Sequence, residues 1–186
     1  LKNKNKKIVK WYNIKRLGNI FFDNKSKLIK TLEEKIFNAV NLWTRSDVDK
    51  IFSLSGGLDS SILAAVYANQ EKKINTISFV YKNDKYKNWN ESLNSDLVAK
   101  NIKSEHQKYF WSAKDFKNDL ENIILSLEEP FGNSLLPWFL YKQIRKDYKV
   151  CITGNGGDEL FGNYMRVENY KKLNGKFYDK KNFENN

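Results

Sequence analysis

The stretch Ser53-Leu54-Ser55-Gly56-Gly57-Leu58-Asp59-Ser60-Ser61 decides the fold of this chain. It lies between a short apolar run at residues 51–52 and a segment of helical composition at residues 62–68, so it predicts a strand, a glycine-containing turn and a helix. In this geometry, backbone N–H groups and the positive end of the helix point at one place, where an anion can bind. Gly56 and Gly57 allow the backbone to approach that ligand closely.

The acidic residue of this stretch, Asp59, indicates which anion binds. A carboxylate repels phosphate, and a divalent cation between the two removes the conflict. The stretch therefore predicts a pyrophosphate or triphosphate together with Mg²⁺, and hence ATP. A plain glycine turn with serine at a helix N-terminus is the alternative. The six residues from Ser55 to Ser60 resemble the PP-loop of ATP pyrophosphatases, which differs from the lysine-containing P-loop, and this match favours the nucleotide.

Length and cysteine content limit the class of protein. The 186 residues suffice for one domain with a hydrophobic core, and Leu1 in place of an initial methionine indicates a piece of a longer protein. A single cysteine, Cys151, excludes a disulfide within the chain and fits a reducing cytoplasm. Because the chain has only one histidine in addition to this cysteine, we do not expect a structural zinc site. No apolar run approaches the ~18 residues of a membrane span, so we expect no membrane association.

The formal net charge of +11 suggests a nucleic-acid partner or, alternatively, solvated lysines without a specific role. The lysines are spread along the chain, and their only dense run is at residues 2–7, without arginine. A nucleic-acid surface requires clustering. The sequence therefore favours a protein that does not bind nucleic acid.

Helical and strand patterns alternate along the chain. We expect helices at residues 23–43, 60–70, 91–101, behind a capping box at 112–115, and at 135–148, and strands at 50–54, 74–81, 105–111 and 149–153. This order predicts an α/β fold with a parallel sheet covered by helices on both faces. Residues 1–48 are expected to be a linker and an amphipathic helix that packs on the domain of residues 49–186. The apolar stripe of that helix is assigned to the core: Leu28, Leu32, Ile36, Val40 and Trp43. His106 is expected to be partly buried and structural, and Cys151 a small buried residue.

A second glycine-rich junction follows the last strand. Thr153 leads into Gly154-Asn155-Gly156-Gly157-Asp158-Glu159-Leu160-Phe161-Gly162-Asn163-Tyr164. Because ligands of parallel sheets bind beyond the carboxyl ends of the strands, both loops are expected to face one crevice. Asp59 and Asp158 would then hold Mg²⁺ against polyphosphate oxygens. The alternative for this loop is a glycine turn before a helix that begins with acidic residues.

With both loops, the chain resembles the synthetase domain of the glutamine-dependent asparagine synthase family over about residues 49–164. The resemblance is carried by residues 55–61, the strand at 76–79, Asn90-Glu91, the turn at 129–132 and the second loop at 154–162. It implies an adenine-nucleotide α-hydrolase-like fold and an ATP-dependent ligase. In this family ATP adenylates a carboxylate, classically that of aspartate, with release of pyrophosphate. Ammonia then attacks the acyl-adenylate to give asparagine and AMP.

The resemblance also implies roles for particular residues. Pyrophosphate would be held by Ser55, Gly56, Gly57 and Ser60, Mg²⁺ by Asp59 and Asp158, and adenosine by Leu54, Phe79, Thr153 and Gly154. The implied partners are ATP, aspartate and ammonia. The resemblance also implies a glutaminase domain on an N-terminal part or on a separate chain, and it is compatible with a homodimer.

Three departures from the family pattern affect the expected reaction. Asn155 replaces the usual acid that is tied to the amide-forming step, and asparagine is not a base near neutral pH. Second, the nucleophilic cysteine with which the glutaminase half of the family begins is absent from the first position. Third, the residues after Tyr164 do not match the later part of the family's domain, which supplies a lysine to the site. The alternatives are an enzyme that adenylates another carboxylate in a biosynthetic cluster, a tRNA-modifying PP-loop enzyme, or an inactive ATP-binding remnant.

Overall fold

The computed structural model describes residues 8–9, 24–70, 73–82, 92–128 and 135–161. The chain divides into two compact units, residues 1–36 and residues 37–186. Helix α1 (Lys25–Trp43) runs across this division, and the sheet lies in the second unit. The packing of residues 1–48 on the domain that follows stays a prediction. No helix in the described part of the chain has the length and apolar character needed to cross a membrane.

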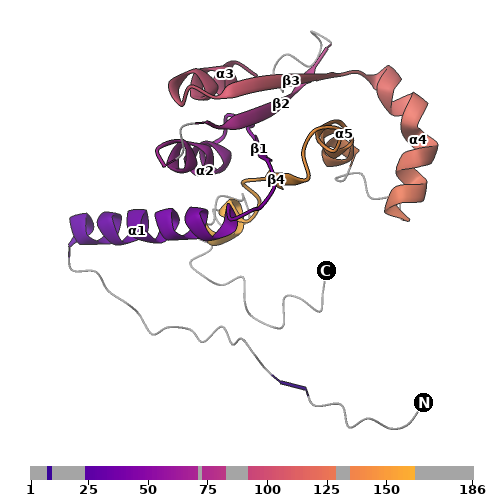
Figure 1. Ribbon diagram of the computed structural model, residues 1–186. Helices are drawn as coiled ribbons and strands as arrows, with labels where there is room; N and C mark the ends of the chain where they lie inside the picture. Colours follow the sequence, from indigo (N-terminus) through magenta and orange to yellow (C-terminus); the bar gives the residue numbers. More distant parts are fainter. Residues whose placement is uncertain (1–7, 10–23, 71–72, 83–91, 129–134, 162–186) are drawn as a thin grey trace, which may run out of the picture. The chain divides into compact units, whose positions relative to one another are not determined.

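Four parallel strands form one sheet, as predicted (Figure 1). They are β1 (Lys50–Ser53), β2 (Asn75–Tyr81), β3 (Glu105–Trp111) and β4 (Val150–Ile152), in the order β3-β2-β1-β4. In the register of the sheet, Phe52 of β1 lies between Thr76 of β2 and Ile152 of β4. The carboxyl ends of β1 and β4 are therefore neighbours, and the two glycine-rich loops leave the sheet side by side.

Five further helices connect or follow the strands: α2 (Leu58–Ala68), α3 (Ser92–Asn101), α4 (Ala113–Leu127), α5 (Leu135–Ile144) and α6 (Gly157–Phe161). Parallel neighbours require such crossover connections. Most helices begin and end within two residues of the predicted bounds. The exception is α5, which ends at Ile144 and continues as a turn, whereas the sequence predicted a helix to residue 148.

The sheet is covered on both faces. Neighbouring residues of β1 point in opposite directions, so Phe52 and Ile51 show what packs on each face. The ring of Phe52 lies 4.8 Å from that of Tyr67 on α2. Ile51 instead forms a buried cluster with Ile77 of β2 and with Leu140 and Ile144 of α5. Figure 1 shows α2 and α3 on one side of the strands and α5 on the other. The expected α/β architecture is thus confirmed.

The apolar stripe of α1 is core at Val40 but not at the last residue of the helix. Val40 is 2% exposed, whereas Trp43 is 78% exposed, so the assignment of Trp43 to the core is wrong. The buried neighbour of Val40 is Thr44, whose backbone N–H and hydroxyl both donate to the Val40 carbonyl. The buried side of the last turn therefore includes Thr44, four residues after Val40, and leaves Trp43 exposed to solvent. Leu28 and Leu32 are also exposed, at 43% and 41%.

Several sequence features lie outside the described residues. They are the linker at 10–22, most of the polar loop at 82–90, Asn90-Glu91, the turn at 129–132 and the last residues of the second loop, 162–164.

Candidate active site

The first loop has the strand–turn–helix geometry that the sequence predicts. Leu54 follows β1, is 1% exposed and donates its backbone N–H to the Ile77 carbonyl at 2.8 Å. Gly56 then turns the chain with φ of 88°, a value that favours glycine over other residues. Gly57 is extended and caps α2, which begins at Leu58. The loop therefore leaves the sheet and enters the helix within four residues.

Serine hydroxyls organise the inside of this loop. The Oγ atoms of Ser55 and Ser60 lie 3.0 Å apart, and the Ser55 N–H donates to Ser60 Oγ at 3.3 Å. The Gly57 N–H donates to Ser55 Oγ at 3.1 Å. The hydroxyls of Ser60 and Ser61 both donate to the Gly57 carbonyl, at 3.2 and 2.7 Å. The loop is thus preorganised, with two hydroxyl groups gathered at the start of α2.

The start of α2 offers free backbone donors. The first N–H groups of a helix have no intrahelical acceptor, and Gly57 has no side chain that could cap them. These donors lie at the positive end of the helix dipole, which attracts anions. The first turn also carries the carboxylate of Asp59. An anion bound there with a cation at Asp59 fits this arrangement better than an anion alone.

The second loop packs directly against the first one. A Cβ added to Gly154 would lie 2.8 Å from the backbone nitrogen of Ser60 and 3.1 Å from Cβ of Asp59. A Cβ added to Gly157 would lie 2.3 Å from Cγ of Asp59. At Gly154 the backbone of Ser60 leaves no room for a side chain, whereas at Gly157 the Asp59 carboxylate would have to turn away from an added Cβ. The Asp59 carboxylate therefore lies against the second loop at the residue just before Asp158.

The remaining residues of the second loop differ in exposure. Asp158 lies in the first turn of α6 and is half-buried, as are Thr153 and Gly154, whereas Asn155 is exposed. Gly156 has φ of 98° and no atom within 4 Å of an added Cβ, so its requirement for glycine comes from backbone conformation. Within the described residues, no group of three or more His, Cys, Asp or Glu side chains is placed to hold a metal ion. A cation at Asp59 and Asp158 would thus need further oxygen ligands.

Phe79, predicted to line an adenosine site, belongs to an aromatic cluster on the α5 face of the sheet. Its ring lies 5.7 Å from that of Tyr81 and 5.8 Å from those of Tyr109 and Trp111. It also packs beside the buried cluster that includes Ile77, the residue that accepts the Leu54 N–H. Leu54 thus directly follows β1 and Phe79 lies on the neighbouring strand β2, and their place in an adenosine site stays a prediction.

Sequence reasoning missed two residues that contact the first loop, Asn94 and Ser95. A Cβ added to Gly56 would lie 2.6 Å from the backbone nitrogen of Ser95 and 2.7 Å from Cβ of Asn94. Ser95 is completely buried, and Ala99, four residues later, is 4% exposed. Small residues four apart on α3 were the available sequence signal, because they allow close packing of the helix on the loop and the sheet.

His106 and Cys151 have no geometry for catalysis. Nδ1 of His106 lies 2.8 Å from Oγ1 of Thr76, and burial lowers the pKa of the imidazole. Cys151 packs beside the buried cluster under α5, and burial raises the pKa of its thiol to about 11. A thiol with this pKa is protonated at neutral pH and is a poor nucleophile. His106 is partly buried, as the sequence predicts, whereas Cys151, predicted to be buried, is only half-buried.

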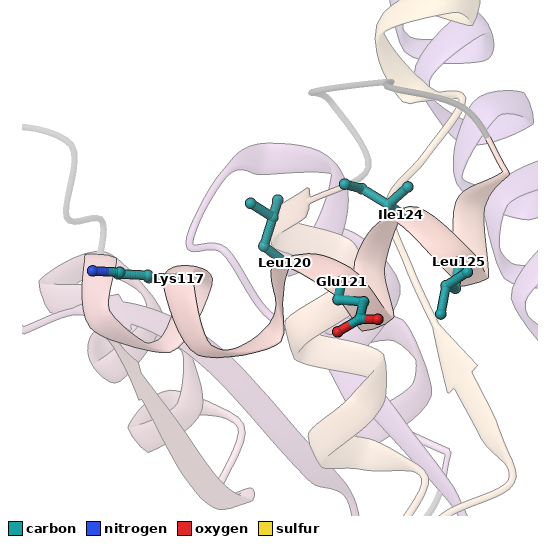
Figure 2. Close-up of a pocket in the computed structure, with 5 residues that line it drawn as sticks. All are labelled: Lys117, Leu120, Glu121, Ile124 and Leu125. Carbon is teal, nitrogen blue, oxygen red and sulfur yellow. The ribbon is translucent and has the colours of Figure 1, made fainter.

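A shallow hollow on α4 is not a convincing active site. Figure 2 shows the residues that line it: Lys117, Leu120, Glu121, Ile124 and Leu125. They all come from one helix, and Ile124 and Leu125 are 53% and 70% exposed. Binding sites usually combine several elements with convergent polar groups. The two facing loops meet that description and the α4 hollow does not.

Comparisons with known proteins agree on one family. The family model described as asparagine synthase matches residues 31–182, which extends the resemblance beyond residues 49 and 164. The chain is 32% identical over 146 residues to "Putative asparagine synthetase (glutamine-hydrolyzing) 2" of Methanocaldococcus jannaschii, covering 76% of this chain and 28% of that protein. It is 29% identical over 140 residues to asparagine synthetase (glutamine-hydrolyzing) 1 of Bacillus subtilis, covering 74% and 22%. Identity to asparagine synthetase (glutamine-hydrolyzing) 3 of B. subtilis is 34% over 143 residues, covering 68% and 23%. The chain thus spans 22–28% of the length of these relatives.

Proposed function

This chain belongs to the asparagine synthase family, and we propose that its two facing loops bind ATP with Mg²⁺ in a protein that makes asparagine from aspartate and ammonia. The observation that carries the proposal is the packing of Gly154 and Gly157 on Asp59 and Ser60. It brings the phosphate-binding loop and a second carboxylate-bearing loop to one place at the carboxyl edge of the sheet, where ligands of parallel sheets bind.

The proposed reaction has two steps. A carboxylate oxygen of aspartate attacks the α-phosphorus of ATP, the bond to the β-phosphate oxygen breaks, and pyrophosphate leaves. Ammonia then attacks the acyl carbon, loses a proton, and AMP leaves with the formation of the amide. Both steps bring anionic or electron-rich groups together, so the site must offset negative charge while they approach.

This chain supplies much of that compensation through its first loop. The N–H groups at the start of α2 and the hydroxyls of Ser55 and Ser60 would donate to the β- and γ-phosphates. Asp59 and Asp158 would provide carboxylate oxygens for a hard cation, because Asp59 lies against Gly157 of the second loop and Asp158 follows that glycine in the first turn of α6. Bound Mg²⁺ would take its remaining ligands from phosphate oxygens and water, and it would reduce the charge of the polyphosphate.

We assign the supply of ammonia to another domain or chain. The single cysteine of this chain lies in β4 with a raised pKa, so it does not serve as the nucleophile for glutamine hydrolysis. A glutaminase elsewhere in the longer protein, or on a partner, would supply ammonia. The cytoplasm, where ATP and aspartate are available, is the proposed location.

Asn155 supports a second candidate, a relative that adenylates a different carboxylate. Its exposed amide stands in the second loop where the resemblance implies an acid for the amide-forming step. An amide neither accepts nor releases a proton near neutral pH. Adenylation would then proceed while transfer to ammonia is slow or is replaced by transfer to another amine.

The test is pyrophosphate release by the full-length protein with ATP, Mg²⁺ and aspartate, with and without ammonia. Aspartate-dependent release with asparagine formed upon addition of ammonia supports the first proposal. Release without asparagine favours a different acceptor and a role of Asn155 in that change. Absence of release with a panel of carboxylates, in a protein that still binds ATP, indicates an ATP-binding remnant.

A variant tests the metal assignment directly. Asp59→Ala should abolish Mg²⁺-dependent ATP binding and leave the domain folded, because the side chain is half-buried and belongs to no apolar cluster. Calorimetric titration with ATP and Mg²⁺ measures the binding, and circular dichroism checks the fold. Asp47→Ala, an exposed position before β1, is the matched control. Normal binding of ATP and Mg²⁺ by the Asp59 variant would show that the metal assignment is wrong.

A further inference from the structure

We propose that Asn94 of α3 is a third contributor to the phosphate site, and that its side-chain amide donates hydrogen bonds to the β,γ-pyrophosphate of bound ATP. This inference rests on the proposed ATP binding and adds a residue outside the two glycine-rich loops. Three observations carry it: the contact of α3 with Gly56, the exposure of Asn94, and the rigid attachment of α3 to the sheet.

The contact with Gly56 places Asn94 at the turn of the first loop. Its Cβ would lie 2.7 Å from a Cβ added to Gly56, and its carbonyl carbon 2.9 Å. The side chain of Asn94 therefore begins beside the glycine whose neighbour, Gly57, caps α2. We assign to its carboxamide, which extends two bonds beyond Cβ, a contact with phosphate bound at this turn.

The amide of Asn94 is free to bind a ligand. Asn94 is exposed, whereas the next residue, Ser95, is completely buried. In the part of the chain that the structure describes, no hydrogen bond engages the Asn94 side chain, and no ion pair or hydrogen bond joins a lysine or arginine to residues 54–61. Neutral donors thus dominate around the first loop, and a carboxamide offers two N–H donors.

The helix that carries Asn94 is fixed to the sheet. Asp96 forms an ion pair of 2.6 Å with Lys108 of β3, and its other oxygen lies 3.7 Å from Nε2 of His106. Ser95 donates its hydroxyl to the Ser92 carbonyl at 3.0 Å. A residue on such an element can hold a donor at a constant position, which a binding site requires.

Charge substitutions of opposite sign provide the test. In the full-length protein, Asn94→Asp should weaken binding of Mg²⁺·ATP and of Mg²⁺·pyrophosphate about tenfold, because it places a carboxylate near the phosphates. Asn94→Lys should increase the affinity for pyrophosphate by up to about tenfold, because it places a cation near the phosphates. Adenosine, which has no phosphate, should bind all variants equally. The same two substitutions at Asn118, an exposed position on α4, are the matched controls and should change little.

The outcomes separate this inference from the proposed function. Opposite shifts for the two Asn94 variants, with unchanged adenosine binding, support a direct contact with phosphate. Equal affinities of both variants and wild type overturn it, and so does a parallel loss of pyrophosphate and adenosine binding, which would indicate a purely structural role. If wild-type protein binds neither ATP nor pyrophosphate, the proposed function itself fails and this inference fails with it.

Discussion

Replacement of Gly157 by alanine should disconnect the second loop from Asp59. The new Cβ would lie 2.3 Å from Cγ and 2.5 and 2.7 Å from the two oxygens of the Asp59 carboxylate. These distances fall about 0.7 to 1.1 Å short of ordinary contact, which begins at 3.4 Å, so the carboxylate must rotate away or the loop must move. Overpacking of this kind costs about 1–3 kcal/mol. Because the Asp59 side chain is half-buried and can rotate, we expect little of this cost in the unfolding free energy.

The cost should appear in the binding of Mg²⁺·ATP, since the rotated carboxylate no longer points at the cation. A loss of about 1–3 kcal/mol corresponds to an affinity about 5- to 150-fold lower. Calorimetric titration of the full-length protein with ATP, with and without Mg²⁺, measures it, and urea unfolding gives the stability. Gly156→Ala is the neighbouring control, because an added Cβ there meets no atom within 4 Å, although its φ of 98° costs about 1–3 kcal/mol of stability.

A double mutant identifies the contact as the cause. In an Asp59→Ala background the added methyl group at position 157 has lost its main neighbour, so it should no longer affect stability or residual nucleotide binding. If Gly157→Ala binds Mg²⁺·ATP as well as wild type does, the second loop does not constrain the Asp59 carboxylate. The two loops would then not form one site.

Three further predictions concern the surroundings of the site. Gly56→Ala should lower the unfolding free energy by about 2–6 kcal/mol in urea titrations, because the new residue would have a φ of 88° and a Cβ 2.6 Å from the Ser95 nitrogen. A variant as stable as wild type would contradict this packing. Asp115→Ala should lower the unfolding free energy by about 1 kcal/mol, because its carboxylate accepts hydrogen bonds from both the N–H and the hydroxyl of Ser112 at the start of α4. An unchanged urea midpoint would show that this cap does not stabilise the helix. Burial lowers the folded-state pKa of His106 below 6.5, so its contribution to stability is present above about pH 6.5 and is lost as the pH falls through the folded pKa. Thermal unfolding between about pH 7 and pH 5 should show this decrease, and a His106→Gln variant with the same pH dependence would assign it to other groups.

Local patterns were sufficient for much of the fold. The apolar run before Gly56 and the helical segment after Ser61 depend on neighbouring residues, so the strand, turn and helix were predictable from sequence alone. The alternation of strands and helices likewise indicated a parallel sheet. Side-chain burial was less predictable: Trp43 fits a helical stripe and is nevertheless 78% exposed, because burial depends on which elements pack against that side.

For the candidate site, too, some features were predictable from the sequence and others were not. The sequence by itself determined the local arrangement on which the proposed phosphate and Mg²⁺ site rests, because Ser55, Gly57 and Asp59 occupy one short turn and Asp158 follows a second glycine-rich strand end. Only the tertiary structure decided that Gly157 lies against Asp59 and that Asn94 lies against Gly56. These contacts join segments far apart in the chain. Their geometry depends on the register of β1 with β4 and on the seating of α3 on the sheet, which no local pattern specifies.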